Sequence, residues 1–206
     1  MDNLLGIFPT PLMHCKSVIS PELIASMIAQ FEDAQPTANV RTSLLRHTPV
    51  SAPRQHPNYR EVLKLVTPKM KAFGMELLGE ELGWGIKEIW INRMEPGGAQ
   101  KLHNHANSFI SGVIYLTETD PGSATVFHKA TSPTSFQMTN ENKRTKMGPF
   151  NATVFRAPPV TPGDLILFPS YIMHEVPPNQ GAPRMTAAFN ALPEQIDSWG
   201  YSIKFK

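Results

Sequence analysis

Residues 103–116 read HNHANSFISGVIYL, a pair of histidines followed by an apolar stretch rich in β-branched residues. From residue 85 onward the chain is a series of short segments of this kind, separated by Gly, Pro, Asn and Asp. This pattern is typical of an antiparallel β sandwich or barrel. The predicted strands lie in GIKEIWINRM, AQKLHNHANS, FISGVIYLTE, ATVFHKA, ATVFRA, GDLILFPS, HEVPP and RMTAAFN.

Two helices are predicted before this β region. The first covers residues 20–34, because Ser20 is a suitable N-cap and Pro21 suits the first helical position. The second covers roughly residues 57–79, and Pro68 is expected to kink or divide it. Their buried faces are predicted to contain Leu23, Ile24, Met27, Ile28 and Phe31 in the first helix and Val62, Leu63, Val66, Met70 and Phe73 in the second.

The expected organisation is a single domain over residues 1–206, with residues 1–84 as helical support and residues 85–192 as the β core. Residues 35–57 are polar and contain prolines, which predicts an irregular loop. Residues 129–152 show little periodicity and are predicted to form a long loop. Loops of that length are uncommon in compact domains and often serve as active-site lids.

Three histidines form a candidate metal site. His103 and His105 lie two residues apart in a predicted strand, so both side chains should point to the same face. His174, in a distant predicted strand, can supply a third ligand. Three ligands on one face of a metal leave the other positions open, which is the layout of a non-haem iron(II) oxygenase. The remaining histidines, which have no such context, are expected to be structural or exposed: His14, His47, His56 and His128.

Four blocks of the sequence resemble the Fe(II)/2-oxoglutarate-dependent oxygenases, and most closely the small prolyl-hydroxylase-like bacterial and phage group. These blocks are IWINRMEPGG, HNHANSFISGVIYL, PGDLILFPSYIMHEVPPN and RMTAAFN. The resemblance is specific over residues 85–192 and weaker over the N-terminal helices. It implies a mainly β fold with a double-stranded β-helix (jelly-roll, cupin-like) core, Fe(II) as metal and 2-oxoglutarate as cosubstrate. The implied reaction hydroxylates a C–H bond and converts 2-oxoglutarate to succinate and CO₂.

The resemblance places His103 and His174 at the two iron-binding histidine positions. His105 stands where most of the superfamily has Asp or Glu. A triad of two histidines and one carboxylate leaves an Fe(II) site with a net charge of about +1, whereas three neutral imidazoles leave it at about +2. Neutral imidazole nevertheless suits Fe(II), so all three histidines are expected to be metal ligands.

Arg184 is the expected partner of the cosubstrate. The distal carboxylate of 2-oxoglutarate needs a buried cation, and arginine offers a planar, permanently charged fork. A hairpin from His174 to Arg184 should bring both side chains into one pocket. Arg184-Met-Thr186 resembles the Arg-x-Ser/Thr cosubstrate motif, and Tyr115 stands where prolyl-hydroxylase-like enzymes have a tyrosine that binds the same carboxylate. Ser111 shares the face of Tyr115 and is expected to line the pocket.

Alternation along RMTAAFN predicts one polar face and one apolar face. The polar face contains Arg184, Thr186, Ala188 and Asn190, and the apolar face contains Met185, Ala187 and Phe189. Tyr115 has an alternative role as a strand aromatic that fills the core. Trp90 and Phe168 are also expected in the core.

Composition excludes several classes of protein. Hydrophobic residues make up 41% and charged residues 17% of the 206 residues, which is a globular composition. The net charge is +2 with scattered Lys and Arg, which argues against nucleic-acid binding. A single cysteine fits a reducing cytoplasm, and no apolar run approaches the roughly 20 residues of a membrane span. We therefore expect a cytoplasmic protein without a membrane partner.

The primary substrate and the oligomeric state stay open at this point. Protein prolyl or other amino-acid side chains, nucleotides and small molecules are all possible substrates. Two alternatives come from other classes of protein. A cupin-like three-histidine metalloenzyme would not use 2-oxoglutarate and would not need Arg184, and a non-catalytic β-sandwich binding or structural module would need neither metal nor cosubstrate.

Overall fold

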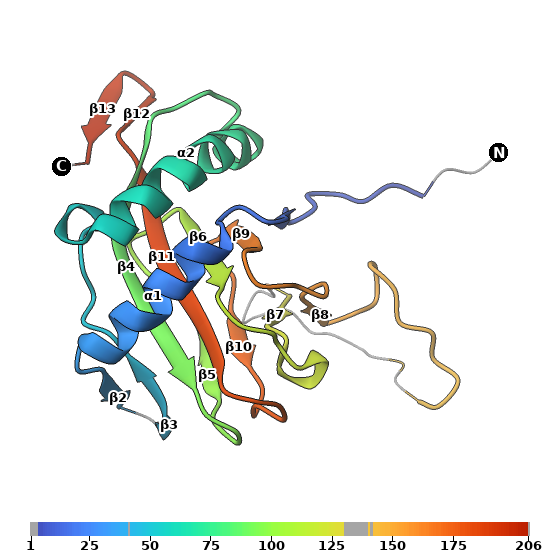
Figure 1. Ribbon diagram of the computed structural model, residues 1–206. Helices are drawn as coiled ribbons and strands as arrows, with labels where there is room; N and C mark the ends of the chain where they lie inside the picture. The colour runs from blue at the N-terminus through green and yellow to red at the C-terminus, as the bar shows by residue number, and fades with distance from the viewer. Residues whose placement is uncertain (1–3, 41, 130–139, 141, 206) are drawn as a thin grey trace.

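Two antiparallel sheets form the core of the computed structural model, which describes residues 4–40, 42–129, 140 and 142–205 (Figure 1). The larger sheet has the strand order β1-β9-β6-β11-β4-β3-β2, and the smaller sheet has the order β5-β10-β7-β8. The strands are β1 (Met13–Cys15), β2 (Thr37–Asn39), β3 (Thr42–His47), β4 (Trp84–Met94), β5 (Gln100–His103), β6 (Ile110–Tyr115), β7 (Val126–His128), β8 (Val154–Arg156), β9 (Leu165–Pro169), β10 (His174–Val176), β11 (Arg184–Pro193), β12 (Gln195–Ser198) and β13 (Tyr201–Lys204). This is the mainly β fold with a double-stranded β-helix core that the sequence predicts.

Both α-helices of the described residues, α1 (Pro21–Asp33) and α2 (Pro57–Leu78), lie against one face of the larger sheet (Figure 1). The Ser20 hydroxyl accepts the Leu23 N–H at 3.3 Å, which confirms the predicted N-cap. Pro68 does not divide α2. The helices and the sheet share one apolar core that includes Met27, Phe31, Val62, Val66, Met70, Phe73, Ile89, Ile91 and Phe189.

Strand β11 separates two environments, as its alternation predicts. Met185, Ala187 and Phe189 are buried in the core beneath the helices. The Phe189 ring lies directly against Gly112 of β6, where any Cβ atom would overlap it. The opposite face of β11 therefore turns toward the smaller sheet, and it carries the polar residues.

Residues 35–57 are not the irregular loop that the sequence predicts. They contain β2, β3 and a short 3₁₀ helix, Pro53–Gln55, and β3 pairs with β4 through Leu45↔Met94 and His47↔Asn92. Strand β1 likewise joins the larger sheet by pairing with β9. These strands are three to six residues long and are stabilised by pairing with distant segments, a contribution that local sequence patterns do not carry.

The predicted hairpin between His174 and Arg184 is wrong. Strand β10 pairs with β5 and β7 in the smaller sheet, whereas β11 pairs with β4 and β6 in the larger sheet. The connection therefore crosses from one sheet to the other. The predicted lid, residues 129–152, includes residues 130–139 and 141, which lie outside the described residues, so this prediction is not tested.

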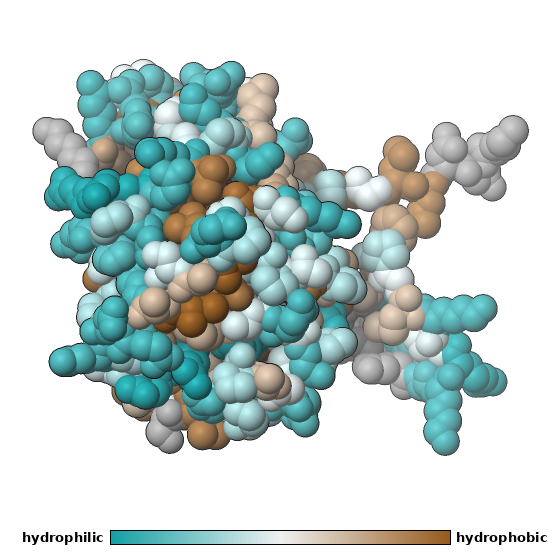
Figure 2. Space-filling view, viewed as in Figure 1, coloured by the Kyte–Doolittle hydropathy of each residue, from teal (hydrophilic) through white to brown (hydrophobic). Residues whose placement is uncertain are grey.

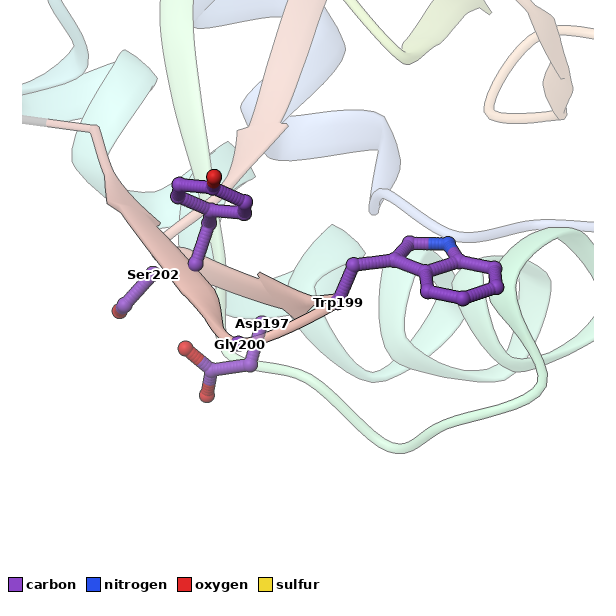
Figure 3. A pocket seen from close by; sticks show the side chains of 5 residues that line it. Asp197, Trp199, Gly200 and Ser202 are labelled. Atoms are coloured by element: carbon purple, nitrogen blue, oxygen red, sulfur yellow. The ribbon is translucent and has the colours of Figure 1, made fainter.

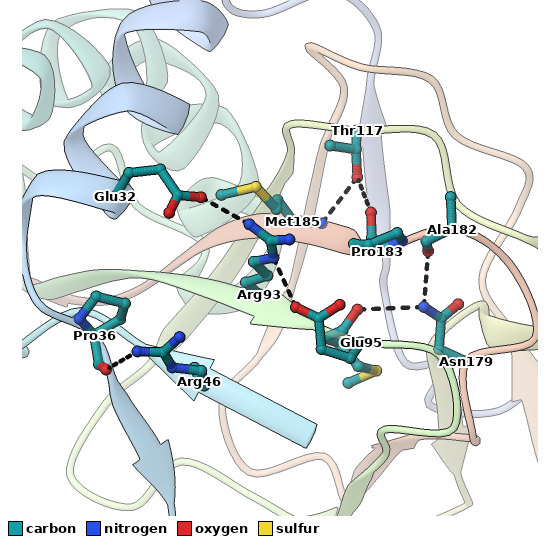
Figure 4. Close-up of polar contacts among 11 residues, drawn as sticks. Glu32, Pro36, Arg46, Arg93, Glu95, Thr117, Asn179, Ala182, Pro183 and Met185 are labelled. Atoms are coloured by element: carbon teal, nitrogen blue, oxygen red, sulfur yellow. Dashed lines mark hydrogen bonds and ion pairs between the residues drawn. The ribbon is translucent and has the colours of Figure 1, made fainter. Parts of the chain in front are cut away.

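The helix side of the molecule is largely hydrophilic, with an apolar area at its centre (Figure 2). A second apolar area lies on the projecting N-terminal arm, where Leu4, Ile7 and Phe8 are exposed. Arg93 ties α1 to β4, since its guanidinium binds Glu32 at 2.7 Å and Glu95 at 2.8 Å (Figure 4). Among the described helices, none combines the length and the apolar character that crossing a bilayer requires.

Candidate metal centre

Two of the three predicted ligands face each other across paired strands. His103 ends β5 and His174 begins β10, and the two residues are direct partners in the antiparallel register. His105 lies beyond the end of β5, where its backbone N–H donates to the carbonyl of Ser170 at 3.0 Å. The predicted strand is therefore too long, and His105 reaches the site from the turn that follows it.

The three imidazoles converge as predicted. One ligand nitrogen from each ring lies within 4.8 Å of the others. The Nδ1 of His103 donates to the carbonyl of Lys101 at 2.7 Å, and the Nδ1 of His174 donates to the carbonyl of Ile172 at 2.9 Å. These bonds put the proton of each ring on Nδ1, so that Nε2 carries the lone pair with which a histidine binds a metal.

Burial and repulsion between the rings keep His105 and His174 neutral. Burial lowers the pKa of His174 to about 3, and repulsion from His103 adds to this effect. Burial lowers the pKa of His105 to about 4, again with a contribution from His103. Neutral imidazoles have a free lone pair, and nitrogen donors of this kind suit Fe(II). The cluster contains no carboxylate among the described residues, so the charge of a bound divalent ion is not reduced by its protein ligands.

One face of the larger sheet, carried by β4, β11 and β6, lies beside this cluster, and we call this face the floor of the site. The strand register arranges the floor residues of β4, β11 and β6 in rows. From the histidine end, these rows are Glu88–Asn190–Ser111, Trp90–Ala188–Val113 and Asn92–Thr186–Tyr115, with Arg184 opposite Met94 beyond them. All four predicted cosubstrate residues, Arg184, Thr186, Tyr115 and Ser111, therefore lie on the same face of the sheet.

Arg184 is a buried cation with an unfilled donor. The residue is 4% exposed, and its Nε atom has no hydrogen-bond partner among the described residues. The guanidinium carbon lies 5.3 Å from the centre of the Tyr115 ring, and no described carboxylate is within ion-pair distance. Burial lowers the pKa of this guanidinium, and Tyr115 opposes the shift. A buried charge without a counter-charge is costly, so this end of the floor fits the carboxylate of a ligand.

The side chains of Thr117 and Asn179 fix the backbone on both sides of Arg184, and Figure 4 shows their contacts. The Thr117 hydroxyl accepts the Met185 N–H at 2.8 Å and donates to the Pro183 carbonyl at 3.4 Å. The buried Asn179 fixes the preceding turn, because its amide nitrogen donates to the carbonyls of Met94 at 3.3 Å and Ala182 at 2.8 Å. The segment that connects β10 to β11 thus holds Arg184 at a defined position on the floor.

Ser111 has a different environment from the other three predicted cosubstrate residues. Its hydroxyl donates to the Asn190 side-chain oxygen at 2.7 Å and lies 2.8 Å from the Ser170 hydroxyl. It is four residues from Tyr115 along β6, a separation of about 13 Å at strand spacing. The structure therefore places Ser111 at the histidine end of the floor.

Sequence reasoning missed the contacts that link His105 to Asn190 and, through Asn190, to Glu88. The alternation of RMTAAFN puts Asn190 on the polar face, but nothing local indicates its partners. Trp90 also lies on the floor rather than in the core, where its indole N–H donates to Asn92 at 3.1 Å and its ring lies 6.1 Å from that of His105.

The other histidines have structural or surface contacts. His14 binds Asp164 at 2.8 Å, His56 caps α2, and His128 binds Glu175 at 3.1 Å. A separate concavity of about 390 Å³ lies at the β12–β13 hairpin and is lined by Asp197, Trp199, Gly200, Tyr201 and Ser202 (Figure 3). It includes none of the three converging histidines.

The family described as "Putative 2OG-Fe(II) oxygenase" matches residues 88–190, which is half of the chain and contains all three histidines and Arg184. The chain belongs to this family. Fe(II) and 2-oxoglutarate are the metal and cosubstrate of these oxygenases, and both fit the site. Three converging imidazoles, two of them oriented by backbone carbonyls, suit the metal. The buried guanidinium, which has no carboxylate partner among the described residues, suits the cosubstrate carboxylate.

Solved structures of 2OG-Fe(II) oxygenases share this fold at low sequence identity. HygX from Streptomyces hygroscopicus, solved with nickel and 2-oxoglutarate, is 14% identical with a TM-score of 0.65, covering 89% of this chain and 83% of its own. An oxidoreductase of the 2OG-Fe(II) oxygenase family from Burkholderia pseudomallei is 16% identical with a TM-score of 0.60, covering 87% and 83%. A prolyl-4-hydroxylase from Pseudomonas putida is 15% identical with a TM-score of 0.56, covering 88% and 92%. Among curated proteins, none matches the sequence.

Proposed function

We propose that this oxygenase hydroxylates a C–H bond of its substrate while 2-oxoglutarate is converted to succinate and CO₂. In this proposal His103, His105 and His174 hold Fe(II). Arg184, Tyr115 and Thr186 hold the distal carboxylate of 2-oxoglutarate. Ser111 remains a further predicted cosubstrate residue, although its present contacts lie at the histidine end of the floor.

One observation carries the proposal. Arg184 is almost fully buried, and its Nε has no partner in the described part of the chain. It lies on the face of the sheet that also carries Asn190, the neighbour of His105. A cupin-like enzyme that does not use 2-oxoglutarate would need the histidines but not this cation. Thr186 and Asn190 are four residues apart, about 13 Å at strand spacing. This distance leaves room for a metal ion and a five-carbon diacid between the two ends.

The residues of the chain have separate tasks in this reaction. Iron, when bound with 2-oxoglutarate and oxygen, supplies the oxidising chemistry. The Arg184 fork and the hydroxyls of Tyr115 and Thr186 bind and orient the far carboxylate. The carbonyls of Lys101 and Ile172 keep two histidine rings in their ligating orientation. The Phe168 and Phe127 rings lie 4.8 and 6.0 Å from that of His174 and exclude water from its side.

Calorimetry of 2-oxoglutarate binding tests this assignment. Protein loaded with Ni(II), a metal that does not support turnover, should bind 2-oxoglutarate without needing a primary substrate. A cupin-like enzyme or a non-catalytic module should give no binding signal at this site. Absence of 2-oxoglutarate binding to protein that demonstrably holds the metal would contradict the proposal.

The primary substrate can then be sought by its effect on turnover. Relatives with this fold include a prolyl-4-hydroxylase and a HygX structure with hygromycin B bound. Peptidyl proline, other amino-acid side chains, nucleotides and small molecules are therefore the classes to screen. The true substrate should accelerate the consumption of 2-oxoglutarate above its unstimulated rate.

A further inference from the structure

His105 differs from the other two histidines in what its Nδ1 atom contacts. His103 and His174 each face a backbone carbonyl, which can only accept a hydrogen bond. The Nδ1 of His105 instead lies 3.3 Å from the side-chain amide of Asn190. A side-chain amide can present either its nitrogen or its oxygen, so the position of the ring proton of His105 depends on the orientation of Asn190.

Neighbouring residues hold the Asn190 amide in one orientation. Its nitrogen donates to Glu88 at 2.8 Å and faces His105, while its oxygen accepts the Ser111 hydroxyl at 2.7 Å. Asn190 is 2% exposed, so water does not replace these bonds. With the amide nitrogen as donor, the Nδ1 of His105 must accept, and the neutral ring carries its proton on Nε2. A protonated Nε2 cannot bind a metal.

Ligation by His105 therefore requires the amide to turn its oxygen toward the ring. The oxygen would then accept Nδ1–H and free the Nε2 lone pair, as the carbonyls do for the other two rings. After the turn, the amide oxygen occupies the present position of the amide nitrogen, which lies 2.8 Å from the Glu88 carboxylate oxygen. Both oxygens are acceptors, so Glu88 opposes the turn. Lys87, whose Nζ lies 3.4 Å from the same Glu88 oxygen, stabilises the charged carboxylate.

We propose that Asn190 and Glu88 determine whether His105 is a metal ligand. Asn190 is the positioning residue, and Glu88 favours the orientation in which His105 does not bind. The site thus passes from two ligating histidines to three when the amide turns. This inference rests on the proposed metal site, because it requires a metal at His103 and His174.

Nitrogen-15 NMR of the metal-free protein at neutral pH shows which ring nitrogen of each histidine carries the proton, and it therefore tests the predicted tautomer of His105. His103 and His174 are internal controls and should carry their proton on Nδ1. His105 should carry its proton on Nε2, and binding of Zn(II) should move that proton to Nδ1. A metal-free His105 that already carries its proton on Nδ1 would overturn the inference.

Titration with Zn(II) tests the role of Glu88, because the proposal and a simple charge effect predict opposite changes in Zn(II) affinity for Glu88→Gln. Gln at position 88 can donate to the turned oxygen of Asn190, so Glu88→Gln should tighten Zn(II) binding by about tenfold, the scale of outer-shell effects. Simple loss of a nearby negative charge would weaken binding instead. In an Asn190→Ala background, Glu88→Gln should no longer tighten binding. Weaker binding by Glu88→Gln alone, or equal tightening in both backgrounds, would overturn the inference.

Two controls separate this inference from the proposed function. His174→Ala should weaken Zn(II) binding strongly. If it does not, the metal site itself is misplaced and the proposed function fails. If His174→Ala weakens binding while Glu88→Gln does not tighten it, only the role of Asn190 and Glu88 is wrong. Far-UV circular dichroism of each variant confirms that the fold is intact before the titrations are compared.

Discussion

The two ends of the site differ in how complete they are without a ligand. At the histidine end, the outer nitrogens of His103, His174 and His105 all have partners within the chain. At the arginine end, the Nε of Arg184 is buried without a partner among the residues that the structure describes. Two of the three histidines are therefore already oriented for a metal, whereas the arginine end has a buried donor that an anion could fill. Metal binding should tolerate changes at the arginine end, and cosubstrate binding should depend on both ends.

The largest effect is expected from His174→Ala. This change deletes a buried ligand and should weaken Fe(II) or Ni(II) binding by more than about 100-fold, the upper range of outer-shell changes. His128→Ala is a matched control, because His128 binds Glu175 rather than the metal cluster. Competition titration with a metal indicator measures both variants. Equal metal affinity in the two variants would remove His174 from the site.

The next largest effect is expected from Arg184→Ala. Truncating one side of a buried charge pair costs about 2–5 kcal/mol, so 2-oxoglutarate affinity should fall about 30-fold or more. Arg184→Lys should recover only part of this loss, because an ammonium group cannot reproduce the bidentate fork. Metal affinity should be unchanged in both variants. A parallel loss of metal and cosubstrate binding would show that the two ends are not independent.

A smaller effect is expected from Thr186→Val, which removes a hydroxyl beside Arg184. Loss of one hydrogen bond to a charged group costs about 1.5 kcal/mol or more, so 2-oxoglutarate affinity should fall about tenfold. Ser111→Ala is the matched comparison. If Ser111 lines the cosubstrate pocket, calorimetry will show a similar loss. If it acts through Asn190 and Ser170, 2-oxoglutarate affinity will change less than in Thr186→Val.

Of the two substitutions at predicted metal ligands, His105→Asp is expected to have much the smaller effect on metal binding. This change preserves the number of ligands and lowers the charge of the loaded site, so metal affinity should stay within about tenfold of the parent protein. The same indicator titration used for His174→Ala gives the comparison. A loss as large as that of His174→Ala would show that His105 has a role other than ligation.

Local sequence patterns predict the elements of this protein better than the connections between them. The N-cap at Ser20, the two helices and the alternation of β11 follow from propensity and periodicity, and the structure confirms them. The pairing of β3 with β4 and the crossover from β10 to β11 depend on contacts between distant segments, so the sequence alone predicts a loop and a hairpin instead.

The site residues also divide into those that the sequence predicts and those whose contacts depend on distant segments. The order of His103, His105, His174 and Arg184 is enough to predict a metal cluster and a cosubstrate cation, and the structure brings the histidines together. The contact between His105 and Asn190 joins residues 85 positions apart, and the contact between Asn190 and Glu88 joins residues 102 positions apart. No local pattern indicates such contacts, because each depends on strand register.

The conversion of 2-oxoglutarate to succinate tests the central claim most directly. Purified protein supplied with Fe(II), oxygen, 2-oxoglutarate and ascorbate should form succinate and CO₂ in equal amounts, even slowly, without a primary substrate, because ascorbate supplies the two electrons that the substrate otherwise provides. The activity should require both iron and oxygen, and it should be lost in His174→Ala and strongly reduced at limiting 2-oxoglutarate in Arg184→Ala. Iron-loaded protein that binds 2-oxoglutarate but forms no succinate, with or without the classes of substrate named above, would contradict the account.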